Sequence, residues 1–243
     1  MSDSLSDQVF DIKAEALKKS FGGHEALRGI DIRIKKGEFY TLFGPNGAGK
    51  TTFIKILSTL AKPSSGSLTV AGHDAVKEPD RVRRVTGVLS HDPFLYENLS
   101  AFENIMFFGT LYGVKDSRGR ARKVIDRVGL GRREHDLVRT FSRGMKQRLA
   151  VARAIVHDPG ILLLDEPYTG LDQHGAGVFG DMLSMLKSDG RTILMTTHNI
   201  DEGLDRSDRV GILAGGRMIY ESGPGGVGKE EFREIYISGV ENV

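Results

Sequence analysis

The sequence predicts an α/β protein with a mostly parallel sheet, an antiparallel β subdomain at its N-terminal end and an inserted helical subdomain. Short apolar strands alternate with helical stretches, which is typical of parallel sheets. A glycine-rich loop at residues 44–52 stands between a strand and a helix. Residues 99–156 are helical and interrupt the strand–helix pattern. The 243 residues fit a single domain that carries such subdomains.

The N-terminal part of the chain alternates between apolar and polar side chains, which is typical of half-buried strands. The alternation is clear in residues 12–17 and again in residues 30–34. We therefore expect a hairpin-rich antiparallel sheet over residues 11–40. Phe21, directly before a Gly-Gly turn, has two interpretations. It can belong to the core, which the pattern alone favours, or it can stack on a nucleotide base.

The glycine-rich loop matches the pattern G-x-x-x-x-G-K-[ST], which is known as the P-loop. An apolar run at residues 38–43 precedes it and apolar residues at helical spacing follow it, so the loop has the strand–loop–helix context of a phosphate site. Its glycines let backbone N–H groups point inward around phosphates. We expect Lys50 to reach the β- and γ-phosphates of ATP, and the Thr51 hydroxyl to bind Mg²⁺. The predicted ATP-binding loop consists of Gly44, Pro45, Asn46, Gly47, Ala48, Gly49, Lys50, Thr51 and Thr52.

A second stretch, residues 223–229, also satisfies G-x-x-x-x-G-K. Glu230 follows it, so the hydroxyl that binds magnesium is missing and a carboxylate that repels phosphate stands there instead. Pro224 also removes one backbone donor. We expect a flexible turn here, without nucleotide.

The stretch from residue 99 to residue 156 has helical periodicity with little β-alternation. Ser100 and Glu103 form a capping box, which opens an apolar-periodic helix. Further helices are expected over residues 117–128 and from near Ser142. The expected division of the single domain 1–243 is an α/β core with its β subdomain at 11–98 and 157–222, the helical subdomain at 99–156 and a tail at 223–243.

Two strands predicted in the second half of the core end just before polar residues. Asp165 and Glu166 follow residues 161–164, and His198 follows residues 192–196. Because ligands bind at the carboxyl ends of parallel strands, these side chains and the P-loop are expected at one edge of the sheet. Asp165 is predicted to hold Mg²⁺ through water, and Glu166 to activate the attacking water as general base. His198 is expected either to donate to the γ-phosphate or to cap a helix.

Composition excludes several classes of function. A net charge of +2 is too small to indicate a nucleic-acid partner. No apolar run approaches the ~18 residues of a membrane span, and the polar N-terminus does not resemble a signal peptide. The absence of cysteine excludes disulfides and thiolate metal sites and fits a reducing compartment. We expect a cytoplasmic protein that docks on a membrane only through a partner.

Motifs spread over nearly the whole chain resemble those of ATP-binding cassette (ABC) transporter ATPases. They are F-G-G at 21–23, G-P-N-G-A-G-K-T-T at 44–52, F-S-R-G-M-K-Q-R-L-A-V-A-R-A at 141–154, I-L-L-L-D-E-P at 161–167, G-L-D at 170–172 and T-T-H at 196–198. The resemblance implies that Phe21 stacks on adenine, that Asp172 is the D-loop acid and that Lys50, Glu166 and the switch residue His198 are catalytic. It also implies that residues 99–156 are the helical subdomain of the family.

The resemblance further implies an assembly. The signature residues Ser142, Arg143, Gly144 and Met145 would contact ATP held by the other subunit of a homodimer or heterodimer. A separate transmembrane subunit would place the chain on the cytoplasmic face of the cell or inner membrane. That subunit would dock on the loop at residues 91–96 and on the helical block. The apolar run Phe94, Leu95 and Tyr96 fits such an interface, although these side chains can equally fold back onto the helices.

The sequence departs from the family pattern in two motifs. The signature usually reads L-S-G-G-Q, and here it reads F-S-R-G-M, in which Ser142 and Gly144 are kept and Arg143 replaces a glycine. His91 stands where the family usually has the Q-loop glutamine. His91 is therefore the third predicted magnesium ligand, after Thr51 and Asp165. The sequence of residues 90–104 resembles that of the haem exporter ATPase of cytochrome c biogenesis. We therefore expect haem export as the function. Drug, polysaccharide or lipid exporters and a soluble non-transport cassette are the alternatives.

Overall fold

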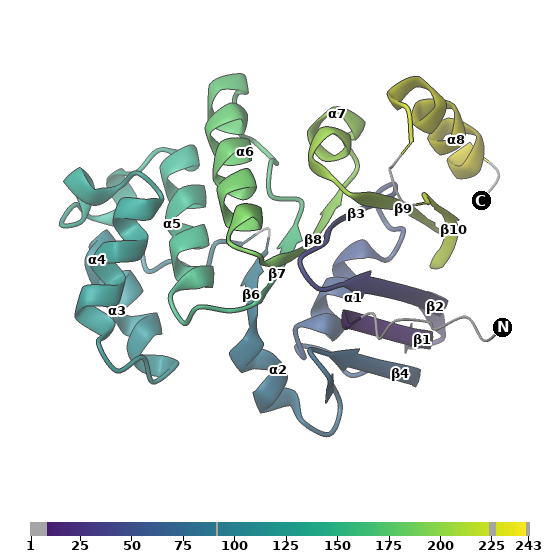
Figure 1. The fold of residues 1–243 in the computed structure, drawn as a ribbon, viewed down its shortest axis with the longest axis horizontal. Coiled ribbons are helices and arrows are strands. Elements are labelled where there is room, and N and C mark those ends of the chain that lie inside the picture. The colour runs from purple at the N-terminus through teal and green to yellow at the C-terminus, as the bar shows by residue number, and fades with distance from the viewer. Residues whose placement is uncertain (1–8, 91, 224–226, 242–243) are drawn as a thin grey trace, which may run out of the picture.

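The computed structural model describes residues 9–90, 92–223 and 227–241 (Figure 1). The predicted ligand His91 lies outside these residues, as does the middle of the second glycine-rich stretch. Among the described residues, every helix is too short or too polar to span a bilayer.

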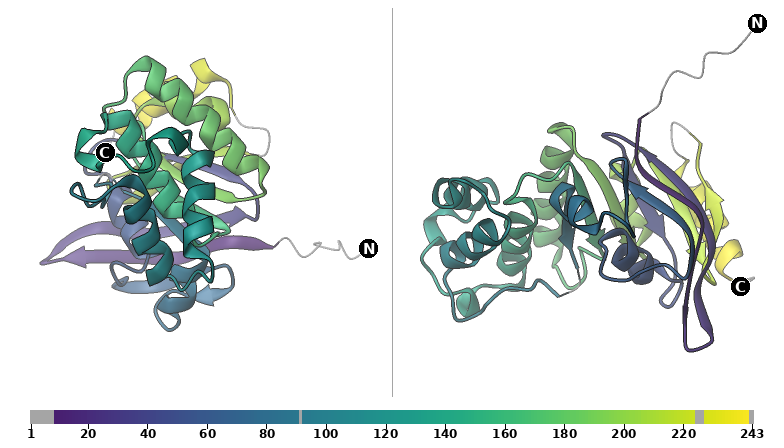
Figure 2. Two further views of the ribbon diagram at one scale, coloured as in Figure 1. Left: turned by 90° about the vertical axis from the view of Figure 1, so that its left-hand side faces the viewer. Right: turned by 90° about the horizontal axis from the view of Figure 1, so that it is seen from below.

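The described strands form two sheets, as Figures 1 and 2 show. The antiparallel sheet has the order β2-β1-β4-β5 and consists of β1 (Phe10–Phe21), β2 (His24–Lys35), β4 (Ser65–Val70) and β5 (His73–Asp74). The other sheet has the order β10-β9-β3-β8-β7-β6. Its strands are β3 (Phe39–Phe43), β6 (Thr86–Leu89), β7 (Ile161–Asp165), β8 (Thr192–Thr197), β9 (Arg209–Ala214) and β10 (Arg217–Glu221). All its pairs are parallel except β9 with β10. The predicted fold class is therefore confirmed.

The β1–β2 hairpin turns at Gly22 and Gly23, whose φ angles are +52° and +92°. Glycine adopts this left-handed backbone without the steric cost that a Cβ brings. The turn places Phe21 opposite His24 at the tip of the hairpin, where 51% of the Phe21 side chain is exposed. The interpretation of Phe21 as a core residue is therefore wrong.

A block of helices lies at the end of the molecule away from the antiparallel sheet (Figures 1 and 2). It contains α3 (Ala101–Leu111), α4 (Ser117–Arg127) and α5 (Arg143–Ile155), with 3-10 turns at Gly131–Arg133 and Val138–Thr140. The predicted capping box is confirmed, because the Ser100 Oγ accepts from the Glu103 N–H and the Glu103 carboxylate accepts from the Ser100 N–H.

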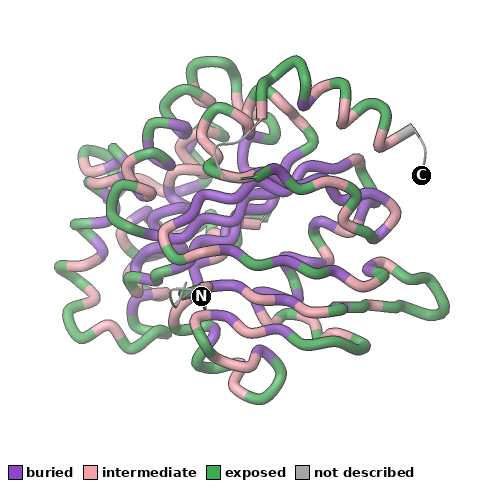
Figure 3. The backbone as a smooth tube through the Cα atoms, turned by 45° about the vertical axis from the view of Figure 1, so that its right-hand side comes forward, coloured by how far each residue is buried: buried purple, intermediate pink, exposed green. Residues whose placement is uncertain are grey.

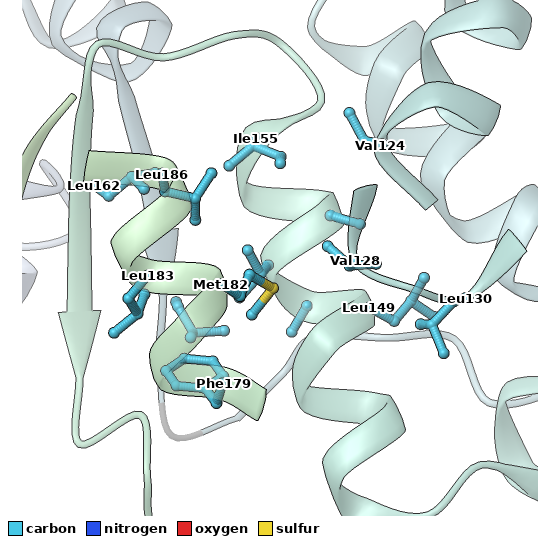
Figure 4. Packing of buried hydrophobic residues seen from close by; sticks show 14 of the residues in the cluster. Val124, Val128, Leu130, Leu149, Ile155, Leu162, Phe179, Met182, Leu183 and Leu186 are labelled. Atoms are coloured by element: carbon cyan, nitrogen blue, oxygen red, sulfur yellow. The ribbon is translucent and has the colours of Figure 1, made fainter. Parts of the chain in front are cut away.

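The core has a large buried cluster on each side of the parallel sheet. One cluster joins α1 (Lys50–Leu57) and the antiparallel sheet to the inner faces of β3, β7 and β8. The other joins α3, α4, α5 and α6 (Gln173–Ser188) to the opposite face, and Figure 4 shows Leu183 and Leu186 of α6 facing Leu162 of β7. Figure 3 shows that the strands between them are the most continuously buried backbone. This rigid sheet fixes the loops at its carboxyl edge.

The expected C-terminal tail contains a helix, α8 (Lys229–Glu241), which the sequence interpretation did not include. Its residues Phe232, Ile235 and Tyr236 recur at helical spacing and pack against Phe43 and the strands β9 and β10. Phe232 is fully buried. The lysine of the second G-x-x-x-x-G-K match, Lys229, is the first residue of this helix.

Candidate nucleotide site and signature cavity

The predicted ATP-binding loop connects β3 to α1 and is held by neighbouring strands. At Gly49 φ is +108°, and a Cβ there would lie 2.5 Å from the Ala26 carbonyl oxygen. A Cβ on Gly44 would lie 2.2 Å from the Leu213 carbonyl oxygen. β2 and β9 thus approach the loop so closely that only glycine fits at these two positions. Gly44 and Gly49 are therefore explained by this packing as well as by phosphate binding.

The loop borders a cavity of about 320 Å³. The cavity is lined by residues 45–52, by Glu166 and, at the hairpin tip, by Phe21, His24 and Ala26. Phe21 presents an exposed ring at this cavity, with the Lys19 Nζ 4.7 Å from the ring centroid. The ring is available to stack on a base, which is the role that the family resemblance predicted for it.

Lys50 is buried at the floor of the site, with 6% of its side chain exposed. Its Nζ donates to the carbonyl oxygens of Gly44 and Pro45, at 2.6 and 3.1 Å. The same Nζ lies 3.1 Å from the Glu166 Oε1. This oxygen is buried and receives no hydrogen bond, so the contact is an ion pair of poor hydrogen-bond geometry. A buried ion pair needs further bonds to offset its desolvation, and Glu166 obtains them from His198.

Glu166 follows β7 in a left-handed backbone conformation, with φ of +50°. Its N–H donates to the Thr196 carbonyl oxygen at 3.0 Å, which fixes this strained residue against β8. Strained non-glycine residues cluster at functional sites, where surrounding structure holds them. The Glu166 Oε2 lies 2.9 Å from the Nδ1 of His198, which is half exposed. The structure therefore brings Lys50, Glu166 and His198 together in one chain of contacts, as the sheet-edge argument predicted.

His198 lies two residues before α7 (Ile200–Gly203), and it does not cap that helix. The cap is Asn199, whose side-chain oxygen accepts from the Asp201 N–H at 3.0 Å. The interpretation of His198 as a cap is therefore wrong. Since a carboxylate only accepts hydrogen bonds, the Nδ1 of His198 donates to Glu166. A neutral His198 then carries no proton on Nε2, and donating to a phosphate as well requires the imidazolium form.

Asp165 ends β7 as a buried side chain, and its Oδ1 accepts from the Thr196 hydroxyl at 2.7 Å. Thr51 lines the cavity on the other side. A hydroxyl and a carboxylate are the hard oxygen ligands that Mg²⁺ takes, and Mg²⁺ in nucleotide sites uses one or two carboxylates together with substrate phosphates. No cluster of three or more His, Cys, Asp or Glu side chains that could hold a metal occurs within the described ranges. The Thr51 hydroxyl and the Asp165 carboxylate fit a magnesium ion that also binds substrate phosphates. Thr196 contacts both Asp165 and Glu166, a role that the sequence did not indicate. The one available signal is its position two residues before His198.

The signature residues border a different cavity of about 410 Å³, which shares no lining residue with the first one. Ser142 and Asp172 cap α5 and α6 there, because their side chains accept from the N–H groups of Met145 and Gly175. Arg143 lies over Gly170, since a Cβ on that glycine would be 2.0 Å from the guanidinium carbon. One cavity is thus lined by the signature residues and the D-loop acid, and Lys50 and Glu166 line the other one; the first group is Ser142, Arg143, Gly144, Met145 and Asp172.

A family model described as ABC transporter matches residues 27–169. The chain belongs to the ABC transporter family. It is 38% identical over 210 residues to the linearmycin resistance ATP-binding protein LnrL of Bacillus subtilis (strain 168), a match that covers 86% of this chain and 68% of that protein. It is also 38% identical over 210 residues to the lantibiotic transport ATP-binding protein SrtF of Streptococcus pyogenes, which covers 86% of this chain and 90% of that protein.

A solved structure shares this fold with 27% sequence identity and a TM-score of 0.78, covering 87% of this chain and 97% of that chain. It is a dimer of the ATP-binding cassette MJ0796 in a post-hydrolysis state, bound to ADP and Pi. The family and the fold together identify this chain as the ATP-binding subunit of an ABC transporter and as a cassette ATPase.

Proposed function

We propose that this chain hydrolyses ATP with Glu166 as the general base and powers the export of antibiotic-like compounds through a separate membrane subunit. The observation that carries the catalytic part is the contact chain Lys50–Glu166–His198 at the P-loop. Bound magnesium ATP supplies the γ-phosphate that water attacks. Each further step follows from groups that this chain provides.

Glu166 takes the proton of the attacking water on its carboxylate, because it is the acid of the site that faces the cavity. His198 orients that carboxylate through its Nδ1. Lys50 exchanges its Glu166 contact for the phosphates, which frees the carboxylate for water. The buried Asp165 and the Thr51 hydroxyl would hold the magnesium ion. Phe21 stacks on the base.

The second step of the proposal is a dimer of cassettes. The signature cavity shares no lining residue with the P-loop cavity, so we assign Ser142 and Gly144 to a nucleotide bound by another subunit. The dimeric form of MJ0796 supports the same arrangement here. Light scattering of the isolated chain with trapped ATP tests whether the second cassette is another copy of this chain.

The cargo class follows from the two relatives. One is named for linearmycin resistance and the other for lantibiotic transport, and neither name refers to haem. We therefore favour the drug-exporter alternative over the expected haem export. The test is to delete the gene for this chain and to measure sensitivity to antibiotics of these classes, with cytochrome c maturation as the control. Unchanged antibiotic sensitivity with lost cytochrome c would restore the haem assignment.

The membrane subunit is proposed to dock on the loop after β6 and on α3. Phe94 and Tyr96 are 53% and 50% exposed, whereas Leu95 packs against the core cluster. The apolar surface continues on α3, where Phe107 and Leu111 are 44% and 70% exposed beside an apolar hollow of about 450 Å³. An exposed apolar patch of this kind marks an interaction site. Through it the chain would sit on the cytoplasmic face of the membrane.

A further inference from the structure

The C-terminal helix α8 contacts α7 and Phe43, the last residue of β3, although the family model ends at residue 169 and does not include it. Figure 1 shows α8 beside α7 and over β9 and β10. α7 is the short helix that closely follows the switch residue His198. Helix α8 thus lies beside the helix that follows His198, one of the proposed catalytic residues.

Two cations of α8 hold a carboxylate of α7. The Lys229 Nζ lies 2.7 Å from the Asp201 Oδ1, and the Arg233 guanidinium lies 3.5 Å from the same oxygen. The pKa of Asp201 is lowered, with the hydrogen bond and the charge of Lys229 as the main causes. Asp201 is three residues after His198. The ion pair therefore ties the first turn of α7 to α8, and His198, two residues before α7, contacts Glu166.

An apolar contact reinforces the ion pair. The fully buried ring of Phe232 lies with its centroid 4.8 Å from the centroid of Phe43, the last residue before the P-loop. The Phe43 ring in turn packs against Gly203 at the end of α7, where a Cβ would lie 2.6 Å from the ring. The Phe43 ring thus lies between Phe232 of α8 and Gly203 of α7. Phe232 therefore packs against the strand that leads into the P-loop and, through Phe43, against the segment 198–203.

The pKa values of two groups on α8 and α7 are affected by charges of the catalytic site. Burial raises the pKa of Tyr236 on α8, and the negative charge of Glu166 raises it further. Burial likewise raises the pKa of Glu202 on α7, while the charge of His198 lowers it. Both groups are close enough to the site for its charges to affect them.

We propose that α8 is a positioning helix for ATP hydrolysis, in which Lys229 and Phe232 hold the segment 198–203 so that His198 stays on Glu166. The proposal rests on the catalytic roles proposed above for Glu166 and His198. It gives the lysine of the second G-x-x-x-x-G-K stretch a purpose other than nucleotide binding. Lys229 acts through Asp201 of α7, so its loss should affect turnover and leave the P-loop contacts with ATP unchanged.

The experiment compares steady-state ATPase kinetics of the full-length wild-type chain with Lys229→Met, Asp201→Asn and the double variant. An exposed ion pair contributes a small free energy, so we expect kcat to fall about two- to fivefold in Lys229→Met, with KM for ATP unchanged. The loss in the double variant should equal that in Asp201→Asn alone, because Lys229 acts only through Asp201. Lys229→Arg should restore kcat. Lys77→Met, which breaks another exposed ion pair with an aspartate far from the site, should have no effect.

Full kcat in Lys229→Met, or losses that add in the double variant, would overturn the proposal. A changed melting temperature with unchanged kcat would show that α8 only stabilises the fold. Phe232→Leu serves as a second probe of the apolar anchor, and it should lower kcat. His198→Ala separates this proposal from the proposed function. If His198→Ala retains wild-type turnover, the catalytic assignment itself is wrong, whereas an inactive His198→Ala beside a fully active Lys229→Met refutes only the role of α8.

Discussion

Alanine at Gly49 should destabilise the protein more than alanine at Gly47, although both glycines belong to the P-loop. Their φ angles are +108° and +82°, so alanine at either position adopts a left-handed backbone, which costs about 1–2 kcal/mol. The surroundings differ. A Cβ on Gly49 would lie 2.5 Å from the Ala26 oxygen and 2.8 Å from the Leu27 Cδ2, whereas a Cβ on Gly47 meets nothing within 4 Å. The difference between the two variants therefore isolates the steric overlap.

Overpacking of this kind typically costs about 1–3 kcal/mol. For a chain of this size, that corresponds to a melting temperature about 2–12 °C lower for Gly49→Ala than for Gly47→Ala. Differential scanning calorimetry of both variants without nucleotide measures the difference directly. Equal melting temperatures would refute the view that β2 packs closely enough to require glycine at position 49.

Further predictions concern nucleotide binding, docking, assembly and pH. Lys50→Met should weaken ATP binding in titration calorimetry, because the phosphates lose a buried charge, and unchanged affinity would exclude Lys50 from the site. Phe94→Ala with Tyr96→Ala should leave basal ATPase activity and the melting temperature near normal and abolish co-purification with the membrane subunit, while retained binding would exclude this surface. With hydrolysis blocked, light scattering should show a monomer without nucleotide and a dimer with ATP and Mg²⁺, and a strict monomer at high concentration would contradict the dimer. Burial lowers the pKa of His157 to about 4, so the unfolded chain binds the extra proton between pH 6.5 and 4 and stability falls as the pH drops through that window. The contribution lost between pH 7 and 5 is about 2 kcal/mol, and urea unfolding of His157→Gln should show a pH dependence smaller by that amount.

The position of the catalytic residues at one edge of the sheet could be predicted from the sequence, because parallel strands bring their carboxyl ends to the same side. Asp165, Glu166 and His198 each follow an apolar run, and this local pattern is sufficient to place them beside the P-loop. The strain at Glu166 could not be predicted, because it depends on hydrogen bonds to Thr196 on the adjacent strand.

Other features depend on contacts between distant parts of the chain. The exposure of Phe21 follows from its place at the tip of a two-stranded hairpin, which apolar patterning does not reveal. Helix α8 was missed because its anchor Phe232 is stabilised by Phe43, nearly the whole chain away, and because a glycine-rich stretch precedes it. The position of Arg143 over Gly170 likewise arises only when α5 packs beside the segment after β7.

The central claim is that Glu166 activates the attacking water, whereas the nucleotide is bound by other residues of the same site, chiefly those of the P-loop. The most direct test is to measure ATP affinity and single-turnover hydrolysis of Glu166→Gln beside the wild-type chain. The amide keeps the size of the side chain and cannot take a proton, so affinity should remain within a few fold while turnover falls about a hundredfold or more. Wild-type turnover in Glu166→Gln would contradict the assignment of the base.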